Sequence, residues 1–171
     1  MNEAPEGGAS LSPAWIKREA RVEVSVAGDV CTKRYFVPLH LRWRTIGRRS
    51  RAHREFDNLA CMHALGLPVV EPLAWSDEWR AGINIASELR TRCLRAAPTL
   101  REVIAARDFA PRIARALGRA LRRFHEAGFV CNTATPRNWL VCDRGPDPEV
   151  VLCDLPNVVQ RAHSTVATTW S

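Results

Sequence analysis

The sequence lacks several signatures that would assign it to a class at once. No apolar run approaches the ~18 residues that a membrane-spanning helix needs. Residues 1–13 are acidic and polar rather than basic and then apolar, so they do not predict a secretory signal. None of the six cysteines forms a Cys-x-x-Cys pair, so the usual zinc spacing is absent. We therefore expect reduced thiols in a cytoplasmic protein, with disulfides as the less favoured alternative.

Lysine is almost missing from a basic chain. Of the 25 Lys and Arg residues only Lys17 and Lys33 are lysines, and the formal net charge is +7. A basic surface attracts nucleic acid, phosphate groups and anionic lipid headgroups. A solvated arginine face is the simpler interpretation. The scarcity of lysine makes each remaining lysine more informative than an arginine would be.

The first half of the chain is rich in predicted strands. Residues 1–13, rich in Gly, Pro and Glu, predict a flexible tail. Alternating polar and apolar residues predict strands over 21–26 and 30–37, which the turn residues 27–29 join as a hairpin. Ser50 can cap a helix that runs to about Leu65. Two further strands, 69–75 and 82–89, follow, and we expect the polar residues 76–78 to form the turn between them.

The second half is rich in predicted helices. A short helix follows Thr99, and a longer one follows Asp108. The longer helix carries an apolar stripe at helical spacing, made of Ile113, Ala116, Leu117, Ala120, Leu121 and Phe124. A small hairpin of residues 139–142 and 150–153 comes last. Strands followed by helices indicate an α+β fold with two lobes.

Four polar residues occur in the order that a kinase requires. A kinase holds the nucleotide phosphates with a strand lysine, which a helix glutamate orients, and holds Mg²⁺ with a loop asparagine and a later aspartate. Lys33 lies on a predicted strand and Glu55 inside the following helix. Asn138 precedes the small hairpin, and Asp154 follows it. Each also has a simpler interpretation, as an exposed strand lysine, a partner of Arg51, or a turn residue.

The runs around these residues resemble a known family. The sequence reads Lys-Arg-Tyr at 33–35, Arg-Ala-His-Arg-Glu-Phe at 51–56 and Gly-Leu-Pro-Val at 66–69. This pattern is similar to that of the lipopolysaccharide core kinases, which phosphorylate Kdo or heptose. In their catalytic loop the family has His-x-Asp-x-x-Pro-x-Asn. Here Pro136 and Asn138 fit, whereas Cys131 stands at the histidine position and Thr133 at the position of the catalytic aspartate.

The resemblance implies a protein-kinase-like fold with two lobes. A small antiparallel-sheet N-lobe with one helix would span 14–89, and a shortened, mostly helical C-lobe would span 90–171. Lys33 and Glu55 would then bind the nucleotide ATP, and Asn138 and Asp154 would hold Mg²⁺. His125, in the run Phe-His-Glu-Ala-Gly-Phe at 124–129, would brace the catalytic loop structurally.

The expected function follows from the departure at Thr133. A threonine hydroxyl cannot act as general base near neutral pH. A glycine-rich phosphate loop is also missing, because Gly28 is the only glycine between residues 9 and 46. We therefore expect a pseudokinase that retains the ATP and Mg²⁺ positions. The alternative is a weakly active lipopolysaccharide sugar kinase, with Asp143 or Asp154 as base. A further alternative is a basic nucleic-acid-binding domain, disfavoured because no aromatic RNA-binding signature is present.

The expected partners follow from the same two features. Beyond the nucleotide, the resemblance implies a lipopolysaccharide core sugar or a partner protein. Arginines surround Trp43 in a basic segment, namely Arg42, Arg44, Arg48 and Arg49. This segment is a candidate for peripheral contact with a phosphate-bearing membrane surface. The expected location is the cytoplasm, and the alternative is the inner face of the inner membrane, where such a contact would place the protein.

Overall fold

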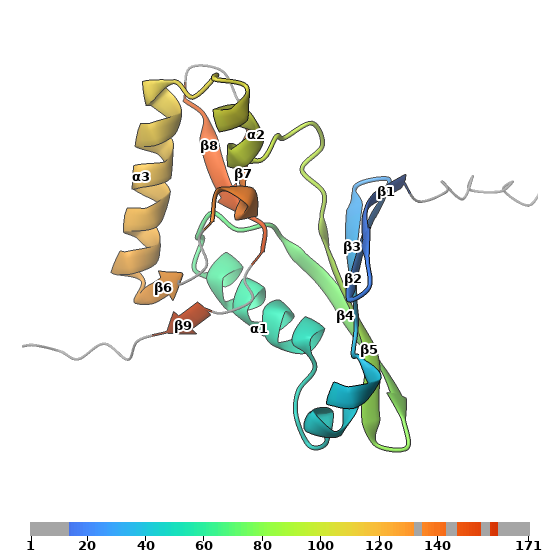
Figure 1. Cartoon of the computed structure of the whole chain (residues 1–171). Coiled ribbons are helices and arrows are strands. Elements are labelled where there is room, and N and C mark those ends of the chain that lie inside the picture. Colours follow the sequence, from blue (N-terminus) through green and yellow to red (C-terminus); the bar gives the residue numbers. More distant parts are fainter. Residues whose placement is uncertain (1–13, 132–134, 143–146, 155–157, 161–171) are drawn as a thin grey trace, which may run out of the picture.

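A five-stranded antiparallel sheet forms the amino-terminal half (Figure 1). The computed structural model describes residues 14–131, 135–142, 147–154 and 158–160. The sheet has the strand order β1-β2-β3-β5-β4. Its strands are β1 (Ala14–Glu19), β2 (Val22–Ala27), β3 (Val30–Phe36), β4 (Pro72–Arg80) and β5 (Ile83–Arg92). The central strand β3 therefore lies between β2 and β5, and β5 carries more of the buried side chains.

Two tight turns determine how the sheet is connected. Gly28 has φ +60° at the turn between β2 and β3, a conformation that glycine adopts without steric cost. Ala81 and Gly82 have φ values of 49° and 74° and join β4 to β5. Two successive left-handed residues are typical of tight hairpin turns. The turn expected at residues 76–78 is wrong, because those residues lie inside β4.

One helix packs on this sheet. Helix α1 (Arg51–Ala64) begins at Ser50, whose side chain accepts a hydrogen bond from the backbone N–H of His53 at 3.0 Å. Its buried residues recur every three or four positions, so they form one face against β4 and β5; they are Ala52, Glu55, Leu59 and Met62. A 3₁₀ helix, η1 (Leu39–Thr45), connects β3 to α1 at the far end of the sheet (Figure 1).

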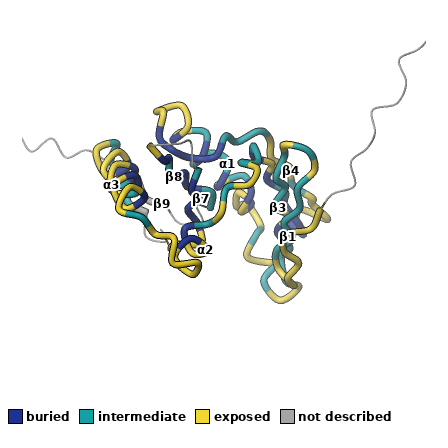
Figure 2. Tube along the Cα trace, turned by 90° about the horizontal axis from the view of Figure 1, so that it is seen from above, coloured by how far each residue is buried: buried dark blue, intermediate teal, exposed yellow. Residues whose placement is uncertain are grey.

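The carboxyl-terminal half combines helices with short strand pairs. It contains α2 (Leu100–Ala105), α3 (Pro111–Glu126), β6 (Phe129–Cys131), η2 (Pro136–Asn138), β7 (Trp139–Cys142), β8 (Glu149–Leu152) and β9 (Val158–Gln160). Strand β6 pairs with β9, and β7 pairs with β8. Helix α3 buries one stripe and exposes the other (Figure 2). The predicted apolar stripe is thereby confirmed at Ile113, Ala116, Ala120 and Phe124.

Backbone hydrogen bonds join the two halves. The N–H of Val70 donates to the carbonyl of Leu152 at 3.1 Å, and the N–H of Leu152 donates to the carbonyl of Pro68 at 2.8 Å. Buried side chains of both halves form one core cluster. The predicted α+β arrangement is confirmed. The lobe boundary after residue 89 stays a prediction, and β5 itself runs to Arg92. The predicted tail, 1–13, lies outside the described residues.

No helix in the described part of the chain is both long and apolar enough to span a bilayer.

Candidate functional site

Lys33 occupies the middle of the sheet. It lies opposite Val24 of β2 and Leu89 of β5. Because side chains alternate along a strand, Lys33 and Tyr35 share one face of β3. Both contact Glu55 of α1, so this face points toward the helix. The sheet thus holds a cation against a helix that carries a carboxylate.

Both oxygens of the Glu55 carboxylate have partners. Lys33 Nζ lies 3.3 Å from Oε1, and the Tyr35 hydroxyl donates to Oε2 at 2.7 Å. Glu55 is only 2% exposed, so this arrangement is shielded from water. The guanidinium of Arg51 lies 4.4 Å from the centre of the Tyr35 ring. A buried carboxylate is stable when paired and hydrogen-bonded in this way.

The carboxyl-terminal half completes the surroundings of Lys33. Its ammonium donates to the backbone carbonyl of Cys153 at 2.7 Å and lies 3.6 Å from Asp154 Oδ1. Lys33 therefore joins three segments: β3, α1 and the residues that follow β8. This contact places the predicted nucleotide lysine next to the predicted metal aspartate.

The charges of these neighbours control protonation. Burial lowers the pKa of Lys33, but Glu55 and, more weakly, Tyr35 and Asp154 raise it by more, so the pKa lies above its ordinary value. Burial and the Glu55 charge raise the pKa of Tyr35, which remains a neutral donor. Burial also raises the pKa of the Cys153 thiol, to about 11. Near neutral pH Lys33 is therefore a cation, whereas the Tyr35 hydroxyl and the Cys153 thiol are neutral.

Asn138 lies beside the same segment. Its side chain is buried, and it ends the 3₁₀ turn η2. Its backbone carbonyl accepts hydrogen bonds from the N–H of Cys153 at 2.8 Å and from the Cys153 thiol at 3.2 Å. The loop that carries Asn138 is therefore attached to the residue before Asp154, which places the two predicted metal ligands on neighbouring segments.

The donor set suits the Mg²⁺ ion that a kinase site implies. Asp154 is 35% exposed as a side chain, yet its Oδ1 is buried and accepts no hydrogen bond from the residues that the structure describes. Lys33, at 3.6 Å from this oxygen, is in ion-pair range but too distant for a good hydrogen bond. Carboxylate and amide oxygens are ligands of hard cations such as Mg²⁺. Among the residues with described positions, no cluster of three or more His, Cys, Asp or Glu side chains could hold a metal.

Two predicted site residues lie outside this group. His125 is exposed near the end of α3, where its backbone carbonyl accepts a hydrogen bond from the N–H of Gly128 at 3.0 Å. Its side chain makes no hydrogen bond among the residues that the structure describes, and its bracing role stays a prediction. Thr133 lies outside the described residues.

Sequence reasoning did not find two contributors. Tyr35 is the second partner of Glu55, and the Cys153 carbonyl is the acceptor for Lys33. Tyr35 lies two positions after Lys33, so the period of a strand could have placed both on one face. A backbone acceptor such as the Cys153 carbonyl leaves no signal in the sequence.

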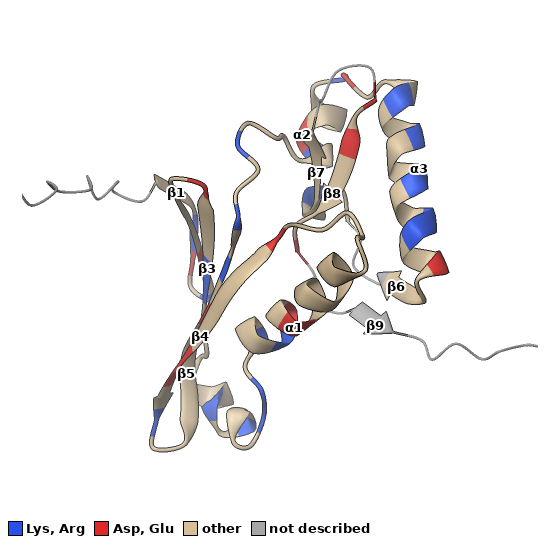
Figure 3. Ribbon diagram, turned by 180° about the vertical axis from the view of Figure 1, so that it is seen from behind, with Lys and Arg blue, Asp and Glu red and all other residues tan. Residues whose placement is uncertain are grey.

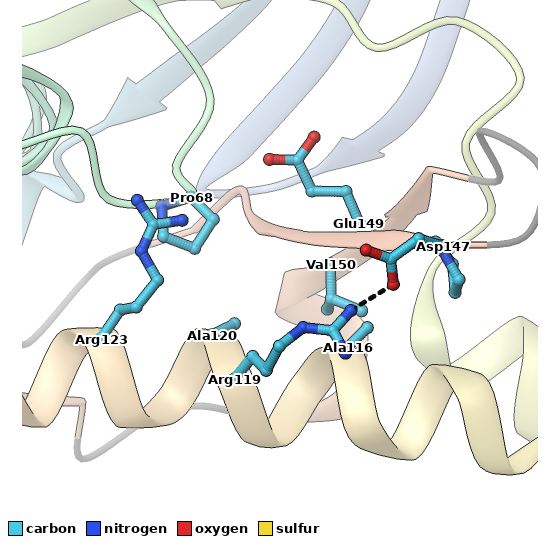
Figure 4. A pocket seen from close by; sticks show the side chains of 9 residues that line it. Pro68, Ala116, Arg119, Ala120, Arg123, Asp147, Glu149 and Val150 are labelled. Atoms are coloured by element: carbon cyan, nitrogen blue, oxygen red, sulfur yellow. Dashed lines mark hydrogen bonds and ion pairs between the residues drawn. The ribbon is translucent and has the colours of Figure 1, made fainter.

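A cavity of about 350 Å³ lies elsewhere in the carboxyl-terminal half (Figure 4). Residues of α3 and β8 line it together with Pro68, and an ion pair joins Arg119 to Asp147 across it at 2.5 Å. Its lining contains neither Lys33 nor Asp154. This cavity is therefore separate from the candidate nucleotide site.

Comparisons with known proteins agree with the fold. The model of the lipopolysaccharide kinase (Kdo/WaaP) family matches residues 39–169. This range includes Glu55, Asn138 and Asp154 and begins after Lys33. No curated protein matches the chain.

Solved structures show the kinase-like fold. A crystal structure of WbdD is similar with a TM-score of 0.61 and 18% identity, covering 87% of this chain and 33% of WbdD. A second structure describes WbdD as a bifunctional kinase-methyltransferase, with a TM-score of 0.57, 19% identity, and coverage of 82% of this chain and 30% of that one.

A structure of WaaP in complex with acyl carrier protein has a TM-score of 0.55 and 19% identity, covering 88% of this chain and 64% of WaaP. The chain thus spans about a third of WbdD and under two thirds of WaaP. The predicted kinase-like fold is confirmed by these likenesses. Because the family model matches most of its length, the chain belongs to the lipopolysaccharide kinase (Kdo/WaaP) family.

Proposed function

We propose that the chain binds ATP with Mg²⁺ through Lys33, Glu55, Asn138 and Asp154, and that it acts as a pseudokinase. The observation that carries this proposal is the buried Lys33–Glu55 pair within 3.6 Å of Asp154. A kinase needs its strand lysine, its helix glutamate and its metal aspartate together before it can bind a nucleotide productively.

Each of these residues has one task. Lys33 offers a permanent cation to the nucleotide phosphates, since its pKa is raised. Glu55 fixes the direction of that cation, and Tyr35 fixes Glu55 through its hydroxyl. Asp154 and Asn138 would hold Mg²⁺ through a carboxylate and an amide oxygen. When bound, the ion would neutralise charge on the nucleotide phosphates.

Thr133 argues for a regulatory rather than a catalytic role. It occupies the sequence position at which the family has its catalytic aspartate. Loss of a positioned general base lowers a rate by roughly 10²–10⁴-fold. Positioning and electrostatic stabilisation do not depend on that residue, so nucleotide binding should persist.

A thermal-shift titration tests the binding proposal. ATP with Mg²⁺ should stabilise the chain by about 2.7 kcal/mol at about 100 times the dissociation constant. The Lys33→Ala variant should lose that shift, because its phosphate cation is removed. The matched control is Lys17→Ala, since Lys17 is the only other lysine and forms an exposed pair with Glu19 at 2.9 Å. Absence of any ATP-dependent shift in the unaltered chain would reject the proposal.

The second candidate function is a weak lipopolysaccharide sugar kinase. The assembled Lys33–Glu55–Asp154 group favours it, because positioning and charge alone supply part of the rate of phosphoryl transfer. Transfer of labelled γ-phosphate to a core-sugar acceptor by the unaltered chain, lost in Lys33→Ala, would establish this function instead of the first.

Restoring the base gives a stricter comparison. We expect Thr133→Asp to raise γ-phosphate transfer by roughly 10²–10⁴-fold if Thr133 is the only missing catalytic group. The measurement is incorporation of label at fixed enzyme concentration, and the matched control is Thr135→Asp in the same loop. An equal rise with Thr135→Asp would show that added charge, rather than a positioned base, is responsible.

A pseudokinase acts through a partner, and we propose a protein partner for this one in the cytoplasm. The similar structure of WaaP contains acyl carrier protein. The +7 net charge of this chain would favour a partner with an acidic surface. Co-elution of acyl carrier protein with the full chain at low salt, lost at high salt, would support this assignment.

A further inference from the structure

The end of the sheet farthest from α3 exposes three large apolar side chains. Leu39 is 78% exposed, Trp43 65% and Ile46 61%, and all three lie in or just after η1. Figure 1 shows η1 beside the turn of the β4–β5 hairpin, where Trp79 is also exposed. Grouped exposed apolar residues mark an interaction surface, whereas isolated ones do not. Nothing in the described part of the chain covers this group.

A basic cavity of about 530 Å³ adjoins the exposed group. Its lining contains no acidic residue and includes six arginines: Arg21, Arg44, Arg48, Arg49, Arg51 and Arg54. Figure 3 shows the basic colour along η1, along the connection to α1 and at the start of α1. The amino-terminal end of α1 opens on the same cavity through Ser50, and a helix amino terminus attracts anions.

Several of these charges are available to a ligand. Arg21 and Arg48 make no ion pair and no side-chain hydrogen bond within the described ranges 14–131, 135–142, 147–154 and 158–160. Arg44 lies 5.3 Å from the centre of the Trp43 ring, so a cation and an indole stand side by side. Two cavity arginines are engaged, because Asp57 pairs with Arg49 at 2.8 Å and Arg54 Nε donates to the carbonyl of Ser50 at 3.4 Å. A surplus of unpaired guanidinium groups selects phosphate, which they bind in a fork geometry.

The exposed apolar side chains and the adjoining arginines together indicate which kind of ligand binds this surface. A soluble phosphate would use the arginines but leave Leu39, Trp43 and Ile46 in water. The headgroup region of an anionic membrane satisfies both sets, because phosphates meet arginines there while tryptophan and aliphatic side chains enter the acyl boundary. Each basic residue near such a surface adds to the attraction.

We propose that this surface, which we name the N-lobe tip (Leu39, Trp43, Ile46 and the six cavity arginines), docks the chain onto an anionic phospholipid membrane. Arg21 and Arg48 contact lipid phosphates, and Trp43 inserts at the interface. The inference does not rest on the proposed function, since Lys33 and Asp154 take no part in it. The candidate nucleotide site adjoins this surface at one residue, because Tyr35 lines the basic cavity and also donates to Glu55.

Vesicle co-sedimentation of the full chain tests the proposal. The chain should bind vesicles of phosphatidylcholine with phosphatidylglycerol, should not bind phosphatidylcholine alone, and should dissociate as salt rises. Trp43→Ser and Arg48→Gln should each weaken binding, the arginine change by about fivefold. The matched controls are Trp15→Ser, since Trp15 is half exposed with Arg18 stacked on it, and Arg115→Gln on the exposed side of α3. Neither control should change binding.

Three results would overturn the proposal. One is equal binding to both vesicle types. Another is a thermal shift with inorganic phosphate but no vesicle binding, which would assign the cavity to a soluble ligand. The third is loss of binding in the two control variants as well as in Trp43→Ser. An unchanged circular-dichroism spectrum and an unchanged ATP response in each variant show that a loss of binding is not a loss of fold.

Discussion

At the scale of single residues, Glu55 connects the sheet to the candidate site. Its two oxygens are engaged by Lys33 and Tyr35; the contact with Tyr35 is buried, and the contact with Lys33 is partly buried. Removing its charge would leave the buried Lys33 cation with Asp154 as its remaining carboxylate partner at 3.6 Å. Loss of a partner lowers stability far more for a buried cation than for a cation at the surface, because the buried charge is left uncompensated.

We therefore expect Glu55→Gln to lower the free energy of unfolding by about 3 kcal/mol or more. Asp57→Asn, on the same helix, removes an exposed carboxylate paired with Arg49 and should cost under about 1 kcal/mol. Urea unfolding of both variants measures the difference. Equal losses would show that the Lys33–Glu55 pair is not shielded from water.

The cysteines provide a second test at the residue scale. Cys61 is exposed, whereas the Cys153 thiol has a pKa of about 11 because of burial and donates to Asn138. Since the thiolate is the reactive form, iodoacetamide should label Cys61 well before Cys153 near neutral pH. Labelling of Cys153 should accelerate only as the pH approaches 11, as peptide mass spectrometry would show. Early labelling of Cys153 would contradict the buried arrangement beside Lys33.

At the scale of elements, α1 depends on its first residue. The Ser50 hydroxyl satisfies the N–H of His53, and this cap begins the helix that carries Glu55. Ser50→Ala should lower the free energy of unfolding by about 1 kcal/mol. It should also weaken the ATP-dependent thermal shift, because the helix end would fray near Glu55. Ser76→Ala, on the exposed side of β4, is the matched control and should change neither quantity.

Elements with a strong pattern could be predicted from the sequence, and elements without one could not. Helix α1 was predicted from its cap at Ser50 and its ending before Gly66, and α3 from its apolar stripe. Strand β1 was not predicted, because all its residues are exposed and it lacks alternation. The β4–β5 turn was misplaced, because β4 is exposed along most of its length and its polar residues resemble a turn.

The same distinction holds for the candidate site. The order of Lys33, Glu55, Asn138 and Asp154 along the chain carried the prediction, and the structure brings Lys33, Glu55 and Asp154 within ion-pair distance. Tyr35 and the Cys153 carbonyl were missed. Tyr35 contributes only through Glu55, and a backbone carbonyl is present at every residue, so neither leaves a motif in the sequence. The N-lobe tip could not be predicted from the sequence either. Arg21 and Arg48 are far apart along the chain, and only the folded structure places both in the lining of one cavity.

At the scale of the whole molecule, the two halves share one core. The isolated bridge between Val69 and Leu152, and the hydrogen bonds beside it, join the segment after α1 to β8. Leu152 is fully buried in that cluster. The chain should therefore unfold as one cooperative unit.

Two spectroscopic probes can check this cooperativity. Urea transitions followed by far-ultraviolet circular dichroism and by tryptophan fluorescence should coincide. Leu152→Ala should shift both curves together, by about 2–5 kcal/mol, because it opens a cavity in the shared core. Leu65→Ala, at an exposed leucine, is the control and should move neither curve appreciably. Separate transitions would show that the halves fold independently.

The contact between Lys33 and the Cys153 carbonyl joins residues 120 positions apart. Contacts that close long loops form late, because the chain must lose much entropy before they contribute. A ribosome that has made the whole sheet and α1 has made Glu55, but it has not yet made the Cys153 carbonyl or Asp154. During synthesis the Lys33 ammonium must therefore wait without its Cys153 acceptor, and the proposed ATP site would be complete only after Asp154 has been made.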